Sequence, residues 1–233
     1  MIELQGLGSV ELVDTLGDAT TIVNSARVSL GKRVEKLTDK DRRLLTYLIA
    51  NEHTSPFRHV SFTFHLRLPL FVLRQWNKHQ VGCAWNEASG RYIQFEPKFG
   101  SFKWREQSDS IKQGSLGELE NQESAENIYK QAVQFAYDSY LKLLELGVCK
   151  EQARSLLPQS LMTECWWTCS FHALMHFLDL RLDSHAQKEI QFFAEAIRAE
   201  AFVDKDLRQL ADIWLEMSQE VREVKQKLRK PSY

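Results

Sequence analysis

The sequence predicts an α+β fold, mostly helical with a small antiparallel sheet, formed by a single domain over residues 1–233. Helical periods of apolar residues dominate the second half of the chain, whereas two short segments in the first half have the period of a strand. A chain of 233 residues can build one core. We find no internal repeat and no linker-like composition, so we expect one domain.

The composition is that of a soluble globular protein, with 43% apolar residues and a formal net charge of −1. The longest apolar run, LPLFVL at 68–73, is far shorter than the roughly 18 residues that a membrane span needs. The first residues lack the basic and apolar parts of a secretion signal. Loose binding to nucleic acid or to a membrane surface needs a basic excess. We therefore expect a cytoplasmic protein with neither partner.

The first half of the chain predicts a strand at 8–14, a helix at 19–29 and a second helix that Thr38 and Asp41 open as a capping box. A loop rich in hydrogen-bonding groups follows at 53–59. Residues 61–68 alternate apolar and polar side chains, which predicts a half-buried strand. Pro69 then suits the start of a helix.

The second half begins with a polar segment at 92–121, which we interpret as a surface excursion of low order. Helices are then predicted at 122–146, with Gly147 as the stop, and at 150–157, with Pro158 as the stop. Residues 161–180 are apolar nearly all round, which indicates a buried helix or a helical break. Two amphipathic helices at 185–203 and 206–228 complete the prediction.

The stretch from Arg74 to Tyr92 concentrates polar chemistry. The helix behind Pro69 is expected to place Arg74 and Lys78 one turn apart on one face, with Gln75 and His79 on the next. Gly82 follows, and then an Asn-Glu-Ala-Ser-Gly-Arg run at 86–91. Cations and backbone N–H groups suit phosphate, and amide groups suit a heterocycle edge. The alternative is a solvated surface, because charged helix faces are common.

Other candidate groups have structural alternatives. His172 and His176 are four residues apart, but Ala173 stands where a metalloprotease has its glutamate, so we predict no metal site. Cys165 and Cys169 are interpreted as core thiols. Two arginines, at 154 and 181, lie in apolar segments and need partners; Asp183 is a structural candidate for the second.

The 78–91 stretch resembles the signature of the flavin-dependent thymidylate synthases, in which Arg-His-Arg precedes an Asn-Glu-x-Ser-x-Arg segment. Here the triplet is Lys78-His79-Gln80, and eight residues rather than seven separate Gln80 from Ser89. Two further segments match the family, Ala153–Pro158 and Leu180–Gln187. The resemblance covers roughly residues 8–92 and 120–200. No Pro-Cys-His tripeptide of the flavin-free synthases occurs, so Cys83 is not proposed as a nucleophile.

The resemblance implies a homotetramer of α+β subunits that share active sites and bind FAD. Its reaction converts dUMP to dTMP, with methylenetetrahydrofolate as one-carbon donor and NADPH as reductant. Ser89, Arg181 and His53 are the implied catalytic residues. The implied dUMP-binding residues are Gln75, Lys78, Glu87, Ala88, Ser89, Gly90, Arg91, Arg154 and Arg181. The implied FAD-binding residues are Ser29, Ser55, Arg58, Lys78, His79, Gln80, Glu87, Ser170, His172 and His176.

Departures from the family pattern gather on the flavin side. Gln80 replaces an arginine, Arg58 an acid, and Ser170, His172 and His176 the residues of an Asn-x-Arg-x-x-x-Asn segment. We hypothesise that Arg58 restores the cation lost at residue 80. Two alternatives stay open: a folate-dependent enzyme with an altered flavin site that makes another 5-substituted product such as 5-hydroxymethyl-dUMP, and a deoxyuridylate-binding protein without chemistry.

Overall fold

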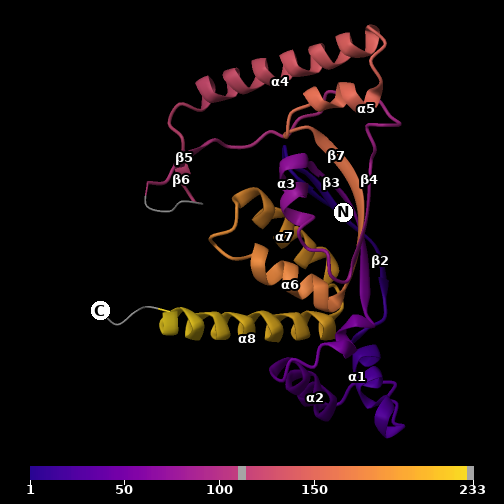
Figure 1. The fold of residues 1–233 in the computed structure, drawn as a ribbon. Helices are drawn as coiled ribbons and strands as arrows, with labels where there is room; N and C mark the ends of the chain where they lie inside the picture. Colours follow the sequence, from indigo (N-terminus) through magenta and orange to yellow (C-terminus); the bar gives the residue numbers. More distant parts are fainter. Residues whose placement is uncertain (110–113, 230–233) are drawn as a thin grey trace.

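A five-stranded antiparallel sheet forms the centre of the computed structural model, which describes residues 1–109 and 114–229, with side chains described up to residue 221 (Figure 1). Its strand order is β1-β2-β3-β7-β4, and a separate two-stranded hairpin pairs β5 with β6. The strands are β1 (Ile2–Leu4), β2 (Gly8–Leu16), β3 (Ser61–Pro69), β4 (Cys83–Glu87), β5 (Arg105–Gln107), β6 (Ser115–Glu118) and β7 (Met162–Ser170).

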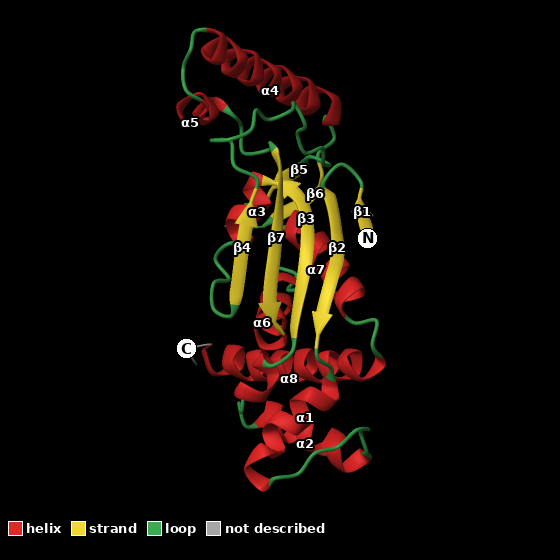
Figure 2. Cartoon of the chain, turned by 90° about the vertical axis from the view of Figure 1, so that its right-hand side faces the viewer, coloured by secondary structure: helices red, strands yellow, loops and turns green. Residues whose placement is uncertain are grey.

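Helices cover one face of the sheet and both of its ends. The helices are α1 (Ala19–Arg27), α2 (Asp39–Ala50), α3 (Leu70–Trp76), α4 (Gln122–Glu145), α5 (Lys150–Ala153), α6 (Phe171–Arg181), α7 (Lys188–Ala201) and α8 (Lys205–Arg229). Helices α3, α6 and α7 lie against one face; α4 and α5 lie at one end, and α1, α2 and α8 at the other (Figure 1). Figure 2 looks at the opposite face, where the strands lie in front of α6 and α7. No described helix is long and apolar enough to cross a bilayer.

The core lies between the sheet and these helices. Phe62, Phe64 and Leu66 are fully buried, as the period-two pattern of 61–68 predicts. Trp76 from α3 stacks on Phe177 from α6, with ring centroids 4.4 Å apart. The sequence pattern therefore identified both the strand and the side that it buries.

The expectation of a buried helix or a helical break over 161–180 was wrong for its first half. Residues 162–170 form β7, the strand between β3 and β4, and only the second half is helical, as α6. Burial alternates along β7: Cys165, Trp167 and Cys169 are buried, whereas Trp166 on the other face is 49% exposed. An apolar run without clear polar positions also fits an interior strand, and only its neighbours distinguish the two.

Three further expectations need correction. Helix α3 ends at Trp76, so Lys78 and His79 do not lie one turn along it from Arg74 and Gln75; they follow in a turn that the His79 N–H closes on the Trp76 carbonyl at 2.9 Å. The segment 92–121 contains the β5–β6 hairpin and is tied to α4, because the Trp104 indole donates to Glu126 at 3.1 Å. The expected helix at 150–157 divides into α5 and a 3₁₀ turn at Arg154–Leu156.

The remaining N-terminal elements agree with the sequence within a few residues. The capping box is present: Asp41 accepts from the Thr38 N–H at 2.8 Å and from the Thr38 hydroxyl at 2.6 Å. Helix 19–29 is α1 followed by a 3₁₀ turn, Val28–Leu30. Gly147 follows α4 in a left-handed conformation, φ 85°, as a C-terminal stop requires.

Cys83 and Cys169 oppose each other across β4 and β7. The Ser170 N–H donates to the Gly82 carbonyl at 3.0 Å, so the two cysteines form a non-hydrogen-bonded pair, whose Cα atoms approach to about 4.5 Å. That separation permits a disulfide. We expect the thiol oxidant diamide to link them reversibly, giving a Cys83–Cys169 peptide pair in a non-reducing digest. Cys83→Ser should abolish it, and a disulfide that joins Cys83 to a cysteine other than Cys169 would contradict this register.

Candidate active site

One group of predicted site residues meets where α3 and α6 end; we call Gln75, His79 and Arg181 the Arg181 cluster. Arg181 Nε donates to His79 Nε2 at 3.1 Å, and Arg181 Nη2 donates to the backbone carbonyl of Gln75 at 3.4 Å. His79 is only 7% exposed. Because His79 Nε2 accepts, its proton is on Nδ1 and the ring is neutral. Burial, and then the charges of Arg181 and His176, lower the pKa of His79 to about 4.

Basic side chains extend from this cluster along α6. The ring of His176 lies 5.6 Å from that of His79. One turn earlier is His172, whose pKa burial lowers, with further contributions from Arg58 and His176. Ser170 caps the start of α6 by accepting from the Ala173 N–H at 3.2 Å. We call Arg58, His172, His176, His79 and Arg181 the basic row. The two guanidinium groups at its ends suit a ligand that carries negative charge, and neutral imidazoles between them can add hydrogen bonds.

A second group of predicted site residues lies at the far end of β4; we call residues 87–91 with Arg154 the 87–91 loop set. Glu87 accepts from the Thr163 hydroxyl at 2.9 Å, and Arg91 pairs with Glu151 at 3.3 Å. At Gly90, a Cβ would lie 3.1 Å from Arg154 Cδ. The loop therefore packs closely on the arginine, with the guanidinium of Arg154 exposed.

Exposed polar residues occupy the opposite end of the sheet. Ser29 lies in the 3₁₀ turn after α1, and Ser55 opens a second one, Ser55–Arg58, which packs against α6. His53 is exposed near Tyr47, with ring centroids 6.0 Å apart. The Arg58 guanidinium donates to Thr54 Oγ1 at 3.2 Å. These residues therefore lie near the His172 end of the basic row.

Within one chain, the predicted residues form separate groups. Figure 1 shows α5, beside the 87–91 loop set, at the opposite end of the sheet from the 3₁₀ turns that follow α1 and α2, with α6 between these ends. Among the described residues, no hydrogen bond or ion pair joins the 87–91 loop set to the Arg181 cluster. Lys78 is exposed, and the Gln80 amide donates to the Asn77 carbonyl, closing the turn. The described residues contain no group of three or more acidic, His or Cys side chains suited to a metal.

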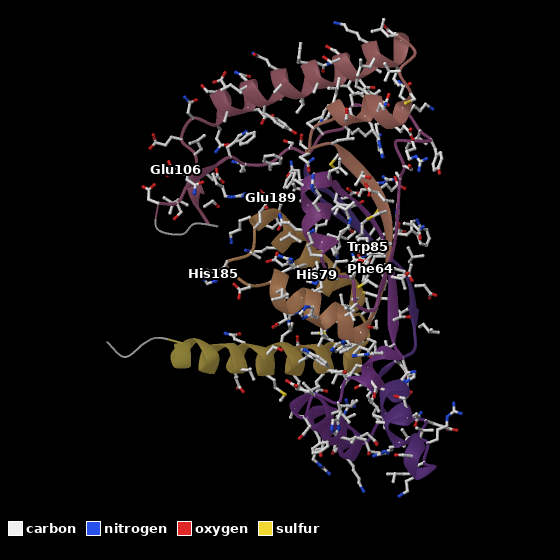
Figure 3. The ribbon with its side chains drawn as sticks, in the orientation of Figure 1. Phe64, His79, Trp85, Glu106, His185 and Glu189 are labelled. Carbon is white, nitrogen blue, oxygen red and sulfur yellow. The ribbon has the colours of Figure 1, made fainter. Side chains whose placement is uncertain are left out.

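Three residues that were not among the predicted site residues support the Arg181 cluster. Glu189, labelled in Figure 3, is buried in the first turn of α7. It pairs with Arg105 of β5. Gln187, in the matched Leu180–Gln187 segment, connects Glu189 to Gln75. The motif could have suggested Gln187, whereas Arg105 lies in a segment that we interpreted as irregular.

The neutral state of His79 predicts an acid-dependent loss of stability. Its pKa falls from 6.5 to about 4 on folding, so the unfolded chain binds more protons between these values. The stabilisation is complete above pH 6.5 and is lost as the pH falls towards 4. Between pH 7.5 and 5, we expect wild type to lose about 2 kcal/mol more unfolding free energy than His79→Gln, measured by urea denaturation. Equal losses in the two proteins would contradict a neutral buried imidazole.

Comparison with known proteins identifies the family. Residues 11–203 match the family model described as thymidylate synthase complementing protein. The flavin-dependent thymidylate synthase of Thermosipho melanesiensis is 43% identical over 201 residues, covering 85% of this chain and 86% of the relative. That of Thermus thermophilus is 44% identical over 191 residues, covering 82% and 70%.

A solved structure has the same fold. The UMP/dUMP methylase PolB from Streptomyces cacaoi, bound with 5-Br dUMP, matches with a TM-score of 0.79 and 30% identity, covering 90% of this chain and 96% of PolB. The sequence matches and the structural match each cover most of this chain. This chain belongs to the family of the flavin-dependent thymidylate synthases.

Proposed function

We propose that the chain methylates C5 of dUMP to give dTMP, with methylenetetrahydrofolate as the one-carbon donor, NADPH as the reductant and FAD as the cofactor. The observation that carries this proposal is the Arg181 cluster. Neutral His79 and the backbone carbonyl of Gln75 accept hydrogen bonds from two nitrogens of the guanidinium. Arg181 is only partly buried. A guanidinium fixed in this way can offer its remaining donors to a planar ligand with carbonyl acceptors, such as uracil.

The nucleotide would be bound by residues of both groups. Arg91 and Arg154 supply exposed cations for its phosphate, and the small 88–90 segment permits close approach of backbone N–H groups. Lys78 adds a third exposed cation. Ser89 Oγ, which accepts from the Arg91 N–H at 3.3 Å, would lie beside the ligand. We assign these residues to binding and orientation, together with Glu87.

The FAD phosphates and ring would lie along the basic row, with Ser29, His53 and Ser55 at one end and Ser170 beside it. FAD held there would supply the hydride that reduction of the one-carbon unit to a methyl group needs, and NADPH would replace that hydride. The chain's own residues supply the charge that holds the cofactor. Gln80 turns its amide to the Asn77 carbonyl, and Arg58 lies near enough to His172 to lower that histidine's pKa. Arg58 thus remains our candidate for the missing cation.

Homotetrameric assembly with shared sites would bring the 87–91 loop set of one subunit to the Arg181 cluster of another. The separation of these groups within one chain supports this, as does the face of β7 opposite the buried Trp167, on which Trp166 is 49% exposed. Each of the variants Arg181→Met and Arg154→Met should be nearly inactive alone. Co-expressed, they should form mixed oligomers with some intact sites and measurable dUMP methylation. No recovery in verified mixed oligomers would contradict shared sites.

The altered flavin side also keeps the 5-hydroxymethyl product as a second candidate. An absorbance spectrum with FAD, NADPH and then dUMP tests the cofactor. We expect a flavin band that NADPH bleaches. A protein that binds dUMP and ignores FAD would refute the proposed function, and the product's mass separates dTMP from 5-hydroxymethyl-dUMP.

A further inference from the structure

A buried ion pair links the β5–β6 hairpin to the N-terminal turn of α7. Glu189 is 2% exposed, and its carboxylate lies 2.7 Å and 3.0 Å from two nitrogens of Arg105. Arg105 also donates from Nε to Ser115 Oγ at 2.9 Å, which ties both strands of the hairpin to the pair. Burying a charged pair gives little net stability. We therefore attribute the role of the pair to the side chains that it holds in place.

The carboxylate of Glu189 orients two amide side chains in succession. Burial raises its pKa, but bonds from Arg105 and Gln187 outweigh this and lower it, so Glu189 is ionised. An ionised carboxylate only accepts, and Gln187 Nε2 accordingly donates to Glu189 Oε2 at 2.8 Å. The Gln187 carbonyl oxygen then turns to Gln75 and accepts from Gln75 Nε2. The series runs from Arg105 through Glu189 and Gln187 to Gln75.

The direction of the series decides which end of the Gln75 amide is available. The Gln75 amide nitrogen is engaged by Gln187. The side-chain carbonyl oxygen of Gln75 is therefore the end that is left for a ligand. Gln75 also lies beside Arg181, which donates to its backbone carbonyl at 3.4 Å. A guanidinium fork and an amide oxygen together offer donors and an acceptor to one ligand. The phosphate of a nucleotide cannot use that acceptor, whereas a ring N–H or a sugar hydroxyl can.

We propose that Arg105 and Glu189 are positioning residues that fix the Gln75 side chain with its carbonyl oxygen towards the nucleotide, where it accepts a hydrogen bond from the base or the sugar of dUMP. This inference rests on the proposed function. It adds the hairpin, which lies outside the matched motifs, to the machinery that selects the substrate.

The sharpest variant is Glu189→Gln, which keeps the shape but can donate as well as accept, so that both downstream amides are free to turn. The matched control is Glu118→Gln, which alters an exposed pair with Lys103 on the same hairpin, 3.1 Å apart. For the FAD-loaded enzyme, we expect Glu189→Gln to raise KM for dUMP about tenfold with kcat within twofold. Glu118→Gln should change neither.

A double-mutant cycle shows whether the effect passes through Gln75. In a Gln75→Ala background, Glu189→Gln should raise KM no further, because the side chain that it orients is absent. Thermal unfolding of all four proteins shows whether they are folded at the assay temperature. An unchanged KM in folded Glu189→Gln, or equal increases in both backgrounds, would overturn the positioning role. Wild type that converts no dUMP would instead refute the proposed function.

Discussion

Replacing Arg181 with methionine is expected to lower kcat/KM for dUMP by about 10²- to 10³-fold. The side chain carries the charge at the centre of the cluster, held by His79 Nε2 at 3.1 Å and by the Gln75 carbonyl at 3.4 Å. Methionine keeps much of the apolar stem and removes every donor. Arg181→Lys should recover only part of the loss, because an ammonium cannot contact His79, Gln75 and a ligand with the geometry of the fork.

The matched control for this substitution is Arg198→Met. Arg198 is 47% exposed and pairs with Asp212 on the surface, so we expect activity within about twofold of wild type. Steady-state kinetics over a range of dUMP concentrations measure both effects. Equal activity of Arg181→Met and Arg198→Met would exclude Arg181 from the site.

Gly90→Ala is expected to lower activity about 10- to 100-fold by moving the 87–91 loop. A Cβ at residue 90 would lie 2.5 Å from Phe95 Cε2 and 3.1 Å from Arg154 Cδ. These contacts are too close, so the ring, the arginine or the loop itself must shift. A shift of the arginine or of the loop misplaces groups that we assign to the nucleotide.

Gly117→Ala in β6 is the matched control, since a Cβ there meets nothing within 4 Å. It should leave activity and melting temperature nearly unchanged. Isothermal titration with dUMP measures the binding part of the Gly90 effect. If Gly90→Ala bound and turned over dUMP like Gly117→Ala, the 87–91 loop set would have no part in the site.

The sequence predicted correctly those elements whose structure is decided by their own residues, such as an alternating strand or a capped helix. The strand at 61–68 alternates strictly, and Thr38 with Asp41 forms the capping box that its spacing indicates. The strand at 162–170 failed as a prediction because its structure depends on two neighbouring strands. The end of α3 at Trp76 likewise depends on β4, which begins at Cys83 and whose first N–H bonds to the Gln80 carbonyl.

The candidate site was predictable only to the extent that motifs marked it. The spacing of residues 75, 79 and 181 could not show that they converge, because the pairing of Arg181 with His79 crosses 102 residues of sequence. Arg105 gave no signal, since it bonds to Glu189, 84 residues away, from a polar segment. Contacts between residues so far apart in the sequence form only when the chain folds, so local sequence patterns cannot predict them.

The most direct test of the account is to incubate the protein with dUMP carrying tritium at C5, together with methylenetetrahydrofolate, FAD and NADPH. Replacing the C5 hydrogen by a methyl group must release the label to water. We predict release that depends on FAD and on the folate, with a product of the mass of dTMP. Binding of dUMP with no release of tritium, by protein shown to be folded, would contradict the account and leave a nucleotide-binding protein without chemistry.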